Sequence, residues 1–227
     1  MFFPDRIKNI QATDRVLEIG PGANPHHRSD VLLELQYNSE EDKQAQFGHT
    51  GELKSDKQIV FYDGTTFPFA DQSFDYVICT HVLEHVPDVP AFLAELFRVG
   101  KKGYLEYPLV YYEYLYNFDV HVNLLKFESG TLYWMKKKDT TLDAFRPVQD
   151  FFYASLQQGY VSHIDQLAPF LMEGFEWERN FPIAPARSIS QVASSGFKIP
   201  VYVNPASLPK SVSYYLKGLI RKILFRE

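Results

Sequence analysis

Residues 16–25 read VLEIGPGANP, a short apolar run that ends abruptly at two glycines and a proline. The apolar residues at its start favour a β-strand, and the glycines allow the tight turn that must follow. A second apolar run, Val31 to Leu35, comes after a segment rich in turn-forming residues. This order of strand, glycine turn and strand predicts the start of an α/β sheet.

Further apolar runs continue the pattern toward the middle of the chain. Three of them lie at residues 58–62, 74–79 and 103–107. The run at 74–79 is almost entirely apolar, which is typical of a strand buried on both faces. After it, Asp88 can cap a helix over residues 89–98, where apolar side chains repeat at helical spacing. Residues 15–108 therefore predict a doubly wound, mostly parallel α/β sheet of the Rossmann-like kind.

The composition of the 227-residue chain limits the classes of function. Its formal net charge of −5 at pH 7 argues against binding duplex nucleic acid by neutralising phosphates. Cys79 is the only cysteine, which excludes an intrachain disulfide and a four-cysteine zinc cluster. We find no run typical of a signal peptide or long enough for a membrane span. We therefore expect a cytoplasmic protein without nucleic-acid partners.

The second half of the chain differs in character from the first. We expect residues 1–108 to form a ligand-binding core, and residues 109–180 to form an aromatic-rich insertion and the remaining sheet, on the substrate side. Residues 121–135 predict a β-hairpin within this insertion. Residues 181–227 are expected to form an extension that ends in a basic amphipathic helix over 212–227. That helix either docks on the domain or contacts a membrane surface or a partner.

Residues that follow the predicted strands are the candidates for ligand binding, because ligands lie beyond the carboxyl ends of parallel strands. These positions hold Gly20 and Gly22 after the first strand, Glu34 in the second, Asp63 after the third, and Thr80 and His81 after the fourth. The dinucleotide fingerprint G-x-G-x-x-G fails at Pro25, so a pyrophosphate cradle is disfavoured. A carboxylate such as Glu34 can accept hydrogen bonds from two adjacent ribose hydroxyls.

Together these motifs resemble the class I S-adenosylmethionine-dependent methyltransferases, of the small-molecule, methyltransferase-11-like type. The resemblance covers about residues 14–108. It rests on VLEIGPGANP at 16–25, DGTTFPFADQSFDYVICTHVLEHVPD at 63–88 and AFLAELFRVGKKGYLEYP at 91–108. It implies a seven-stranded Rossmann-like sheet with a C-terminal substrate cap, S-adenosylmethionine as the cofactor, and methyl transfer as the activity.

The same resemblance assigns roles to residues of the cofactor site. It implies that Glu18, Gly20 and Gly22 lie at the methionine end, Glu34 at the ribose, Asp63 and Gly64 at the adenine, and Thr80 and His81 near the methyl group. The acceptor is not implied by any motif. A small molecule is favoured, and a saccharide or lipid-linked acceptor would give the helix predicted over 212–227 a role at a membrane.

Residues 80–86 read THVLEHV and contain His81-x-x-Glu84-His85, the H-x-x-E-H signature of inverted zinc peptidases. Such a site needs both histidines on one helix, whereas His81 directly follows a predicted strand. We therefore expect no metal at this motif. A zinc-dependent hydrolase stays open as an alternative function. So does a methyltransferase-like domain that binds the cofactor or a partner without catalysis.

Three side chains are candidates for acid-base chemistry at the acceptor. They are His81, Glu106 and His121, which carry ionisable groups on the substrate side. Methyl transfer requires in-line approach of a nucleophile to the methyl group. An enzyme of this type can therefore work largely by positioning, without an obligatory catalytic residue.

Overall fold

The computed structural model describes residues 1–36, 53, 55–157 and 164–193. The chain divides into two compact units, Met1–Ser195 and Gly196–Glu227, and the description below concerns the first. The domain boundaries expected at residues 108 and 180 fall inside this unit, so the three-part division stays a prediction. The helix predicted over 212–227 lies outside the described residues.

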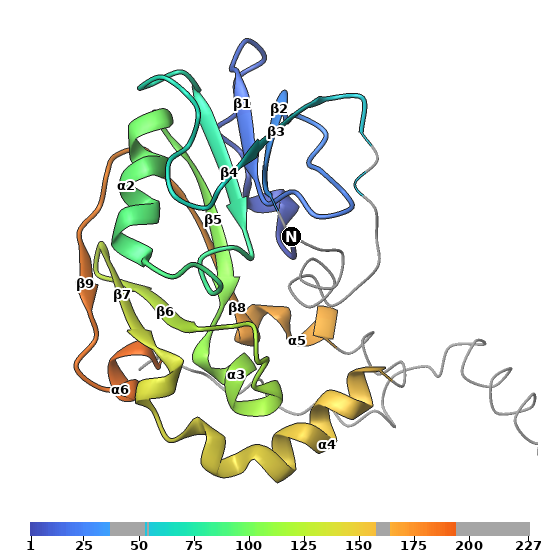
Figure 1. Ribbon diagram of the computed structural model, residues 1–227, viewed down its shortest axis with the longest axis vertical. Helices are drawn as coiled ribbons and strands as arrows, with labels where there is room; N and C mark the ends of the chain where they lie inside the picture. The colour runs from blue at the N-terminus through green and yellow to red at the C-terminus, as the bar shows by residue number, and fades with distance from the viewer. Residues whose placement is uncertain (37–52, 54, 158–163, 194–227) are drawn as a thin grey trace, which may run out of the picture. The chain divides into compact units, whose positions relative to one another are not determined.

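The central sheet has six strands within the described part of the chain, in the order β3-β2-β1-β4-β5-β8 (Figure 1). The strands are β1 (Val16–Ile19), β2 (Val31–Leu35), β3 (Gln58–Tyr62), β4 (Tyr76–Thr80), β5 (Gly103–Pro108) and β8 (Met172–Trp177). Neighbours among β1 to β5 pair in parallel, and β8 pairs antiparallel with β5. The predicted α/β class with a mostly parallel sheet is confirmed.

The seventh strand that the resemblance implied is not found among the described residues. The hairpin expected after β5 does form, as β6 (Asn123–Glu128) and β7 (Thr131–Lys136). It does not join the central sheet, because β7 pairs instead with β9 (Ile183–Pro185) in a separate three-stranded sheet. The hairpin turn is made by Ser129 and Gly130, which both have positive φ.

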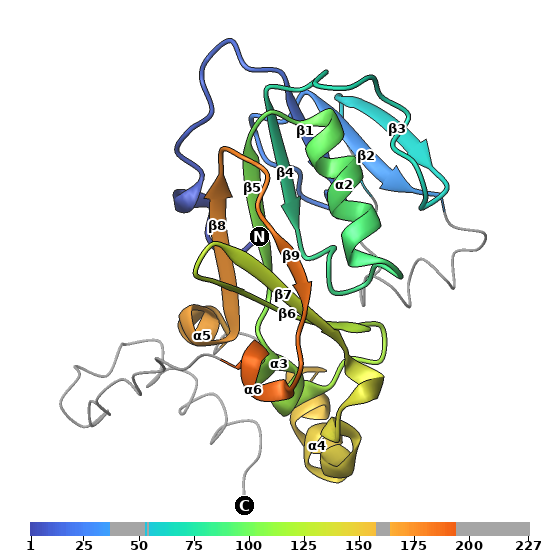
Figure 2. The same cartoon turned by 90° about the vertical axis from the view of Figure 1, so that its left-hand side faces the viewer.

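Helix α2 (Val89–Val99) connects β4 to β5 and packs on one face of the central sheet (Figure 2). Asp88 caps its first turn as predicted, because its Oδ1 accepts a hydrogen bond from the backbone N of Ala91 at 3.0 Å. The buried side chains of the helix join the main core; they are Val89, Phe92, Leu93, Leu96, Phe97 and Val99. This apolar stripe fixes α2 against the sheet.

Alternate side chains of β1 point to opposite faces of the sheet, as strand geometry requires. Leu17 and Ile19 lie in the core under α2, whereas Val16 packs on the other face with the rings of Tyr76 and Tyr104. The connection from β1 to β2 contains no helix. That second face is instead covered in part by Ile7 and Ile10 of the N-terminal segment.

The remaining described elements are helices. They are the α-helices α3 (Val110–Tyr116), α4 (Arg146–Gln157), α5 (Ile164–Leu171) and α6 (Ile189–Val192), and the 3-10 helices η1 (Pro4–Arg6), η2 (Lys137–Asp139) and η3 (Leu142–Phe145). Within the described residues, no helix combines the length and apolarity that crossing a membrane requires.

Candidate active site

Two glycines in the left-handed region shape the turn after β1. They are Gly20 with φ 62° and Gly22 with φ 60°. A Cβ on Gly20 would lie 2.6 Å from Cγ2 of Val82, so this turn packs directly on the loop that follows β4. A Cβ on Gly22 would meet no atom within 4 Å, because that position faces open space. The geometry fits the close backbone approach that the sequence predicted.

Two cavities lie at the carboxyl ends of β1, β2 and β4. The small cavity, of about 120 Å³, is lined by Glu34, Tyr62, Gly64, Val82 and Phe92 among others. The large cavity, of about 790 Å³, is lined by Gly22, Thr80, Glu84, His121, Arg146 and Asp150 among others. Gly20, His81 and His85 line both, so the cavities adjoin at the glycine turn.

Most of the predicted cofactor residues come together at these cavities. Gly20, Gly22, Glu34, Gly64, Thr80 and His81 are all lining residues. Glu34 is 6% exposed on β2, and Thr80 is buried at the end of β4. The order of the strands in the sheet explains this gathering, because β2, β1 and β4 are neighbours and all end at the same edge.

Glu18 and Asp63 are not among the lining residues of either cavity. Glu18 is buried, and its Oε2 accepts hydrogen bonds from Oγ of Ser29 at 2.6 Å and from N of His26 at 2.8 Å. Burial raises the pKa of the Glu18 carboxyl, and these bonds oppose the rise. The carboxylate thereby holds the loop between β1 and β2. Its contact with a cofactor stays a prediction.

Asp63 is exposed and caps its own turn. Its Oδ1 accepts hydrogen bonds from Oγ1 and N of Thr65, at 2.6 and 2.9 Å, and these bonds lower the pKa of the carboxyl. This is the local Asx geometry that Asp-Gly sequences favour. A role for Asp63 at the adenine therefore stays a prediction, while the neighbouring Gly64 lines the small cavity.

His81 lies at the junction of the two cavities and is fixed by Glu106 of β5. The residue has φ 57°, and its Nε2 lies 2.9 Å from Oε1 of Glu106. Burial works against protonation of the ring, but the hydrogen bond to Glu106 and the nearby Glu84 raise the pKa of His81 above its ordinary value. Glu106 and Glu84 therefore stabilise the protonated form of His81 relative to a free imidazole.

Glu106 has more partners than a free general base would have. Its two oxygens also accept hydrogen bonds from the backbone N of Phe2, the backbone N of Phe3 and the hydroxyl of Tyr104. Burial alone would raise the pKa of this carboxyl, but the bond to His81 and these donors lower it to about 2. The contacts favour a positioning role for Glu106, and its predicted role as a base stays untested.

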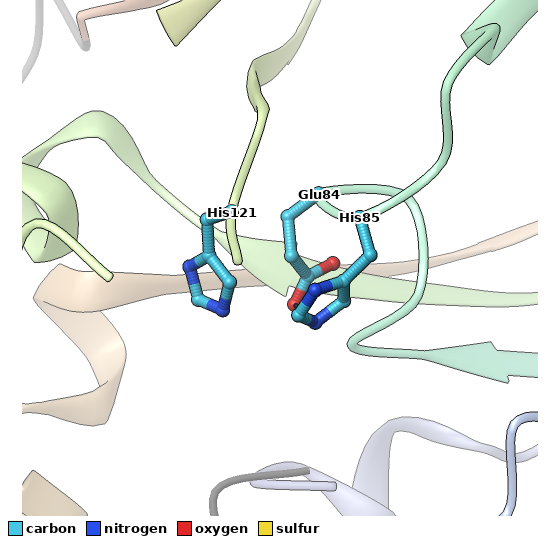
Figure 3. A group of neighbouring side chains, drawn as sticks. All are labelled: Glu84, His85 and His121. Atoms are coloured by element: carbon cyan, nitrogen blue, oxygen red, sulfur yellow. Dashed lines mark ion pairs between the residues drawn. The ribbon is translucent and has the colours of Figure 1, made fainter. Parts of the chain in front are cut away.

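His121 enters the large cavity from the segment between α3 and β6. Its Nδ1 lies 2.5 Å from Oε1 of Glu113, which leaves Nε2 toward the cavity side of the ring. The ring of His121 lies edge-to-face with that of His85, with centroids 4.7 Å apart. Figure 3 shows His121 facing His85 and Glu84, which arrive on a different segment of the chain. His121, a predicted catalytic residue, thus lies beside two residues of the H-x-x-E-H motif.

The sequence did not identify the aromatic and charged wall of the large cavity. Tyr112, Tyr116 and Phe118 lie on this wall, together with Arg146 and Asp150 of α4. The richness in tyrosine after residue 110 indicated aromatic packing in this region. Nothing in the sequence around α4 distinguished Arg146 or Asp150 from the other charged residues of a surface helix.

Comparison with known proteins gives one match to a family and several weak matches to structures. Residues 30–105 match the family model described as a methyltransferase domain. No curated protein matches the chain. An S-adenosylmethionine-dependent methyltransferase of Thermotoga maritima, a possible histamine N-methyltransferase, is 21% identical, with 47% of this chain and 49% of that chain covered and a TM-score of 0.33.

Two further methyltransferase structures show similar levels of likeness. That of Methanosarcina mazei is 21% identical, with 53% of this chain and 69% of the other covered and a TM-score of 0.32. That of Mesorhizobium loti is 11% identical, with 73% and 91% covered and a TM-score of 0.39. The chain spans about half the length of the Thermotoga protein.

The match of residues 30–105 to a methyltransferase domain agrees with the resemblance to the class I S-adenosylmethionine-dependent methyltransferases drawn from the motifs. The cofactor of this class is S-adenosylmethionine. The residues present fit that group, because the left-handed Gly22 faces open space and two cavities adjoin at Gly20. Glu34 and Gly64 lie on the small cavity, where a nucleoside would be recognised.

Proposed function

We propose that the chain transfers a methyl group from S-adenosylmethionine to a small-molecule acceptor. The observation that carries this proposal is the pair of cavities that adjoin at Gly20, His81 and His85. A cofactor with a nucleoside at one end and an amino acid at the other needs two adjoining spaces. Glycines between these spaces let the backbone lie close to the cofactor. The methyltransferase-domain match over residues 30–105 supports the same cofactor.

In this proposal the small cavity holds the nucleoside. Glu34 would accept hydrogen bonds from the ribose hydroxyls, since its side chain is buried in the wall of that cavity. Tyr62 and Phe92 offer aromatic surface to the base. The backbone of Gly20 and Gly22 would approach the amino-acid end, where a side chain larger than hydrogen would be in the way.

Bound S-adenosylmethionine supplies a methyl group on a positively charged sulfur: a lone pair of the acceptor forms the new bond to carbon as the carbon–sulfur bond breaks and its electron pair stays on sulfur. The part of the chain is to orient the reactants and exclude water. Aromatic faces stabilise a cation, and Tyr112, Tyr116 and Phe118 line the large cavity. His81, held by Glu106, sits where the two cavities adjoin.

The acceptor is proposed to be small because of the space available to it. A volume of about 790 Å³ falls in the range typical of small-molecule sites. The net charge of −5 gives no support for a nucleic-acid acceptor. A saccharide or lipid-linked acceptor, with membrane contact through residues 212–227, stays a prediction about residues outside the described part.

The zinc hydrolase alternative loses its geometric basis. Residues 81–85 form a turn and no helix, and His81 has φ 57°, so the two histidines of the motif do not share a helical face. Nε2 of His81 is also bonded to Glu106. A domain that binds cofactor without catalysis is the remaining alternative, and a turnover measurement separates it from an enzyme.

The test is to incubate the full chain with S-adenosylmethionine and a panel of small hydroxyl and amine compounds, and to measure S-adenosylhomocysteine. We expect acceptor-dependent product from the wild type and from the control Glu178→Gln, which changes an exposed carboxylate. Gly22→Val, which puts a branched side chain into the open space, should reduce the rate by about a hundredfold or more. Binding of S-adenosylhomocysteine with no turnover on any acceptor would favour the non-catalytic alternative.

A further inference from the structure

The carboxylate of Glu84 is buried and lies beside two histidines without a hydrogen bond to either of them. Its side chain is 1% exposed, and neither oxygen accepts a hydrogen bond from a described residue. Nδ1 of His81 lies 3.4 Å and Nε2 of His85 lies 3.9 Å from its Oε1. A buried, unsatisfied carboxylate in a native structure calls for an explanation such as a bound ion.

Two imidazoles face this carboxylate with the same ring nitrogen unoccupied. Nδ1 of His85 donates to the carbonyl oxygen of Val120 at 3.0 Å, and Nδ1 of His121 donates to the Glu113 carboxylate at 2.5 Å. A neutral ring that donates from Nδ1 presents a lone pair at Nε2. Histidines that bind metals in proteins are oriented in this way, by a carbonyl or carboxylate on the other ring nitrogen.

Ligand atoms of Glu84, His85 and His121 all lie within 4.8 Å of one another, at the wall of the large cavity (Figure 3). Bonds of about 2.0–2.2 Å to one ion would bring such atoms to roughly 3–3.5 Å apart. Side-chain rotations would therefore have to bring these ligand atoms about 1 Å closer to one another.

The backbone around the three residues is already fixed across a long separation in sequence. The carbonyl oxygen of Glu84 accepts hydrogen bonds from the backbone N of Val122 at 2.7 Å and of Asn123 at 3.0 Å. The side-chain amide of Asn123 donates to the carbonyl oxygens of Leu83 and Val86, at 2.8 and 2.7 Å. These bonds hold the segment that carries His121 against the loop that carries Glu84 and His85.

From this geometry we propose that Glu84, His85 and His121 bind one divalent transition-metal ion, which holds a hydroxyl oxygen of the methyl acceptor in its open coordination positions. Two imidazoles and one carboxylate are a ligand set suited to zinc, iron or manganese. The metal site stands on its own, and the assignment of the acceptor oxygen rests on the proposed function. The sequence analysis expected no metal at the H-x-x-E-H motif, and the proposed site differs from that motif because His121 takes the place of His81.

Such an ion would solve a chemical problem that the described side chains leave open. A hydroxyl acceptor must lose its proton, and the candidate base Glu106 already accepts hydrogen bonds from four partners. A divalent ion lowers the pKa of a coordinated hydroxyl, so the proton can pass to water in the cavity. The oxygen is then free to form the bond to the methyl carbon.

The first experiment titrates zinc into chelator-treated full-length chain and measures bound metal after dialysis. We expect one zinc per wild-type chain and the same for the control His27→Gln, which removes a histidine outside the cluster. His121→Gln and Glu84→Gln should lose stoichiometric zinc. Glu113→Gln, which keeps the three ligands but alters the support of His121 and the contact with Lys137, should weaken binding by about 10- to 100-fold.

His81→Gln separates this site from the H-x-x-E-H motif. The proposed site keeps its zinc in that variant, whereas the motif reading requires its loss. Zinc binding unchanged in His121→Gln, or no zinc bound by the wild type, would overturn the proposal and leave the cluster as an ion pair between Glu84 and protonated histidines. Because the small cavity proposed for the nucleoside does not include His121 or Glu84, metal-free chain should still bind S-adenosylhomocysteine.

A spectroscopic measurement covers the case in which a variant fails to fold. Wild-type chain loaded with cobalt(II) should show two strongly shifted, exchangeable imidazole N–H signals in its proton NMR spectrum. These are the Nδ1 protons of His85 and His121, which are protected by Val120 and Glu113. A spectrum with no shifted imidazole N–H signal, or with a single one, would contradict the assignment.

Discussion

Some single residues in this chain have both a candidate chemical role and a structural role, and only the first could be predicted from the sequence. Glu106 was a candidate base, and the structure shows it holding His81, Tyr104 and the backbone of Phe2 and Phe3. Its type and its place at the end of a strand could be predicted. Its partners could not, because Phe2 lies 104 positions away and no local pattern encodes that contact.

Replacing Glu106 should change how stability depends on pH. Its pKa is about 2 in the folded chain and about 4.3 when unfolded. A lowered pKa means that the ionised group stabilises the fold above about pH 4.3, and that this contribution is lost as pH falls toward the folded value. Glu106→Gln should therefore lower the free energy of unfolding by roughly 3 kcal/mol near neutral pH, and by much less at about pH 2.

Urea denaturation of both forms across this pH range provides the check. Asp75→Asn is a suitable control, since the pKa of that half-buried carboxyl is also lowered but its partners are Arg15 and Lys101 and not His81. A difference between wild type and Glu106→Gln that stays constant with pH would show that packing, and not charge, explains the loss.

Gly20→Ala should be destabilising for two separable reasons. The left-handed φ of 62° costs an alanine about 1–2 kcal/mol, and the new Cβ would lie 2.6 Å from Cγ2 of Val82. In the double variant Gly20→Ala with Val82→Ala, the steric clash should be relieved, whereas the backbone strain at position 20 should remain. A thermal unfolding cycle of the four forms measures the coupling, and additive effects would contradict the contact.

At the scale of elements, a strand or helix could be predicted where the residues that determine it lie close together in the sequence. The strands β1 to β5, helix α2 and its cap at Asp88 follow from apolar runs, helical spacing and a capping residue within a few positions. Strand β8 has no such signal, since it reads MEGFEW. It enters the sheet through distant contacts: Gly174 leaves room for the Tyr104 hydroxyl, 2.1 Å from where its Cβ would lie.

The cap of α2 gives a prediction at this scale. Asp88→Ala removes the acceptor for the N–H of Ala91 and should cost about 1 kcal/mol of stability. Asp88→Asn keeps an oxygen acceptor and should lie within a few tenths of a kcal/mol of the wild type. Chemical denaturation measures both. Equal losses in the two variants would mean that the charge of Asp88, and not its hydrogen bond, stabilises the helix.

At the scale of the whole molecule, the site is assembled from segments that the sequence could not relate. The order of the strands brings Gly20, Glu34 and His81 to one edge of the sheet, and this part of the site was predicted from the fold class. His121 reaches the same cavity from a segment 36 residues after His85. The position of His121 depends on hydrogen bonds from the backbone N of Val122 and Asn123 to the carbonyl oxygen of Glu84, and no sequence motif predicts these bonds.

The central claim, that the adjoining cavities bind the methyltransferase cofactor, is tested most directly by calorimetric titration with S-adenosylhomocysteine. The account predicts a dissociation constant on the order of micromolar for the wild type and for Glu178→Gln. Glu34→Ala, which removes the proposed acceptor for the two ribose hydroxyls, should bind about tenfold more weakly or worse. No heat of binding to correctly folded wild-type chain, or full affinity in Glu34→Ala, would contradict the account.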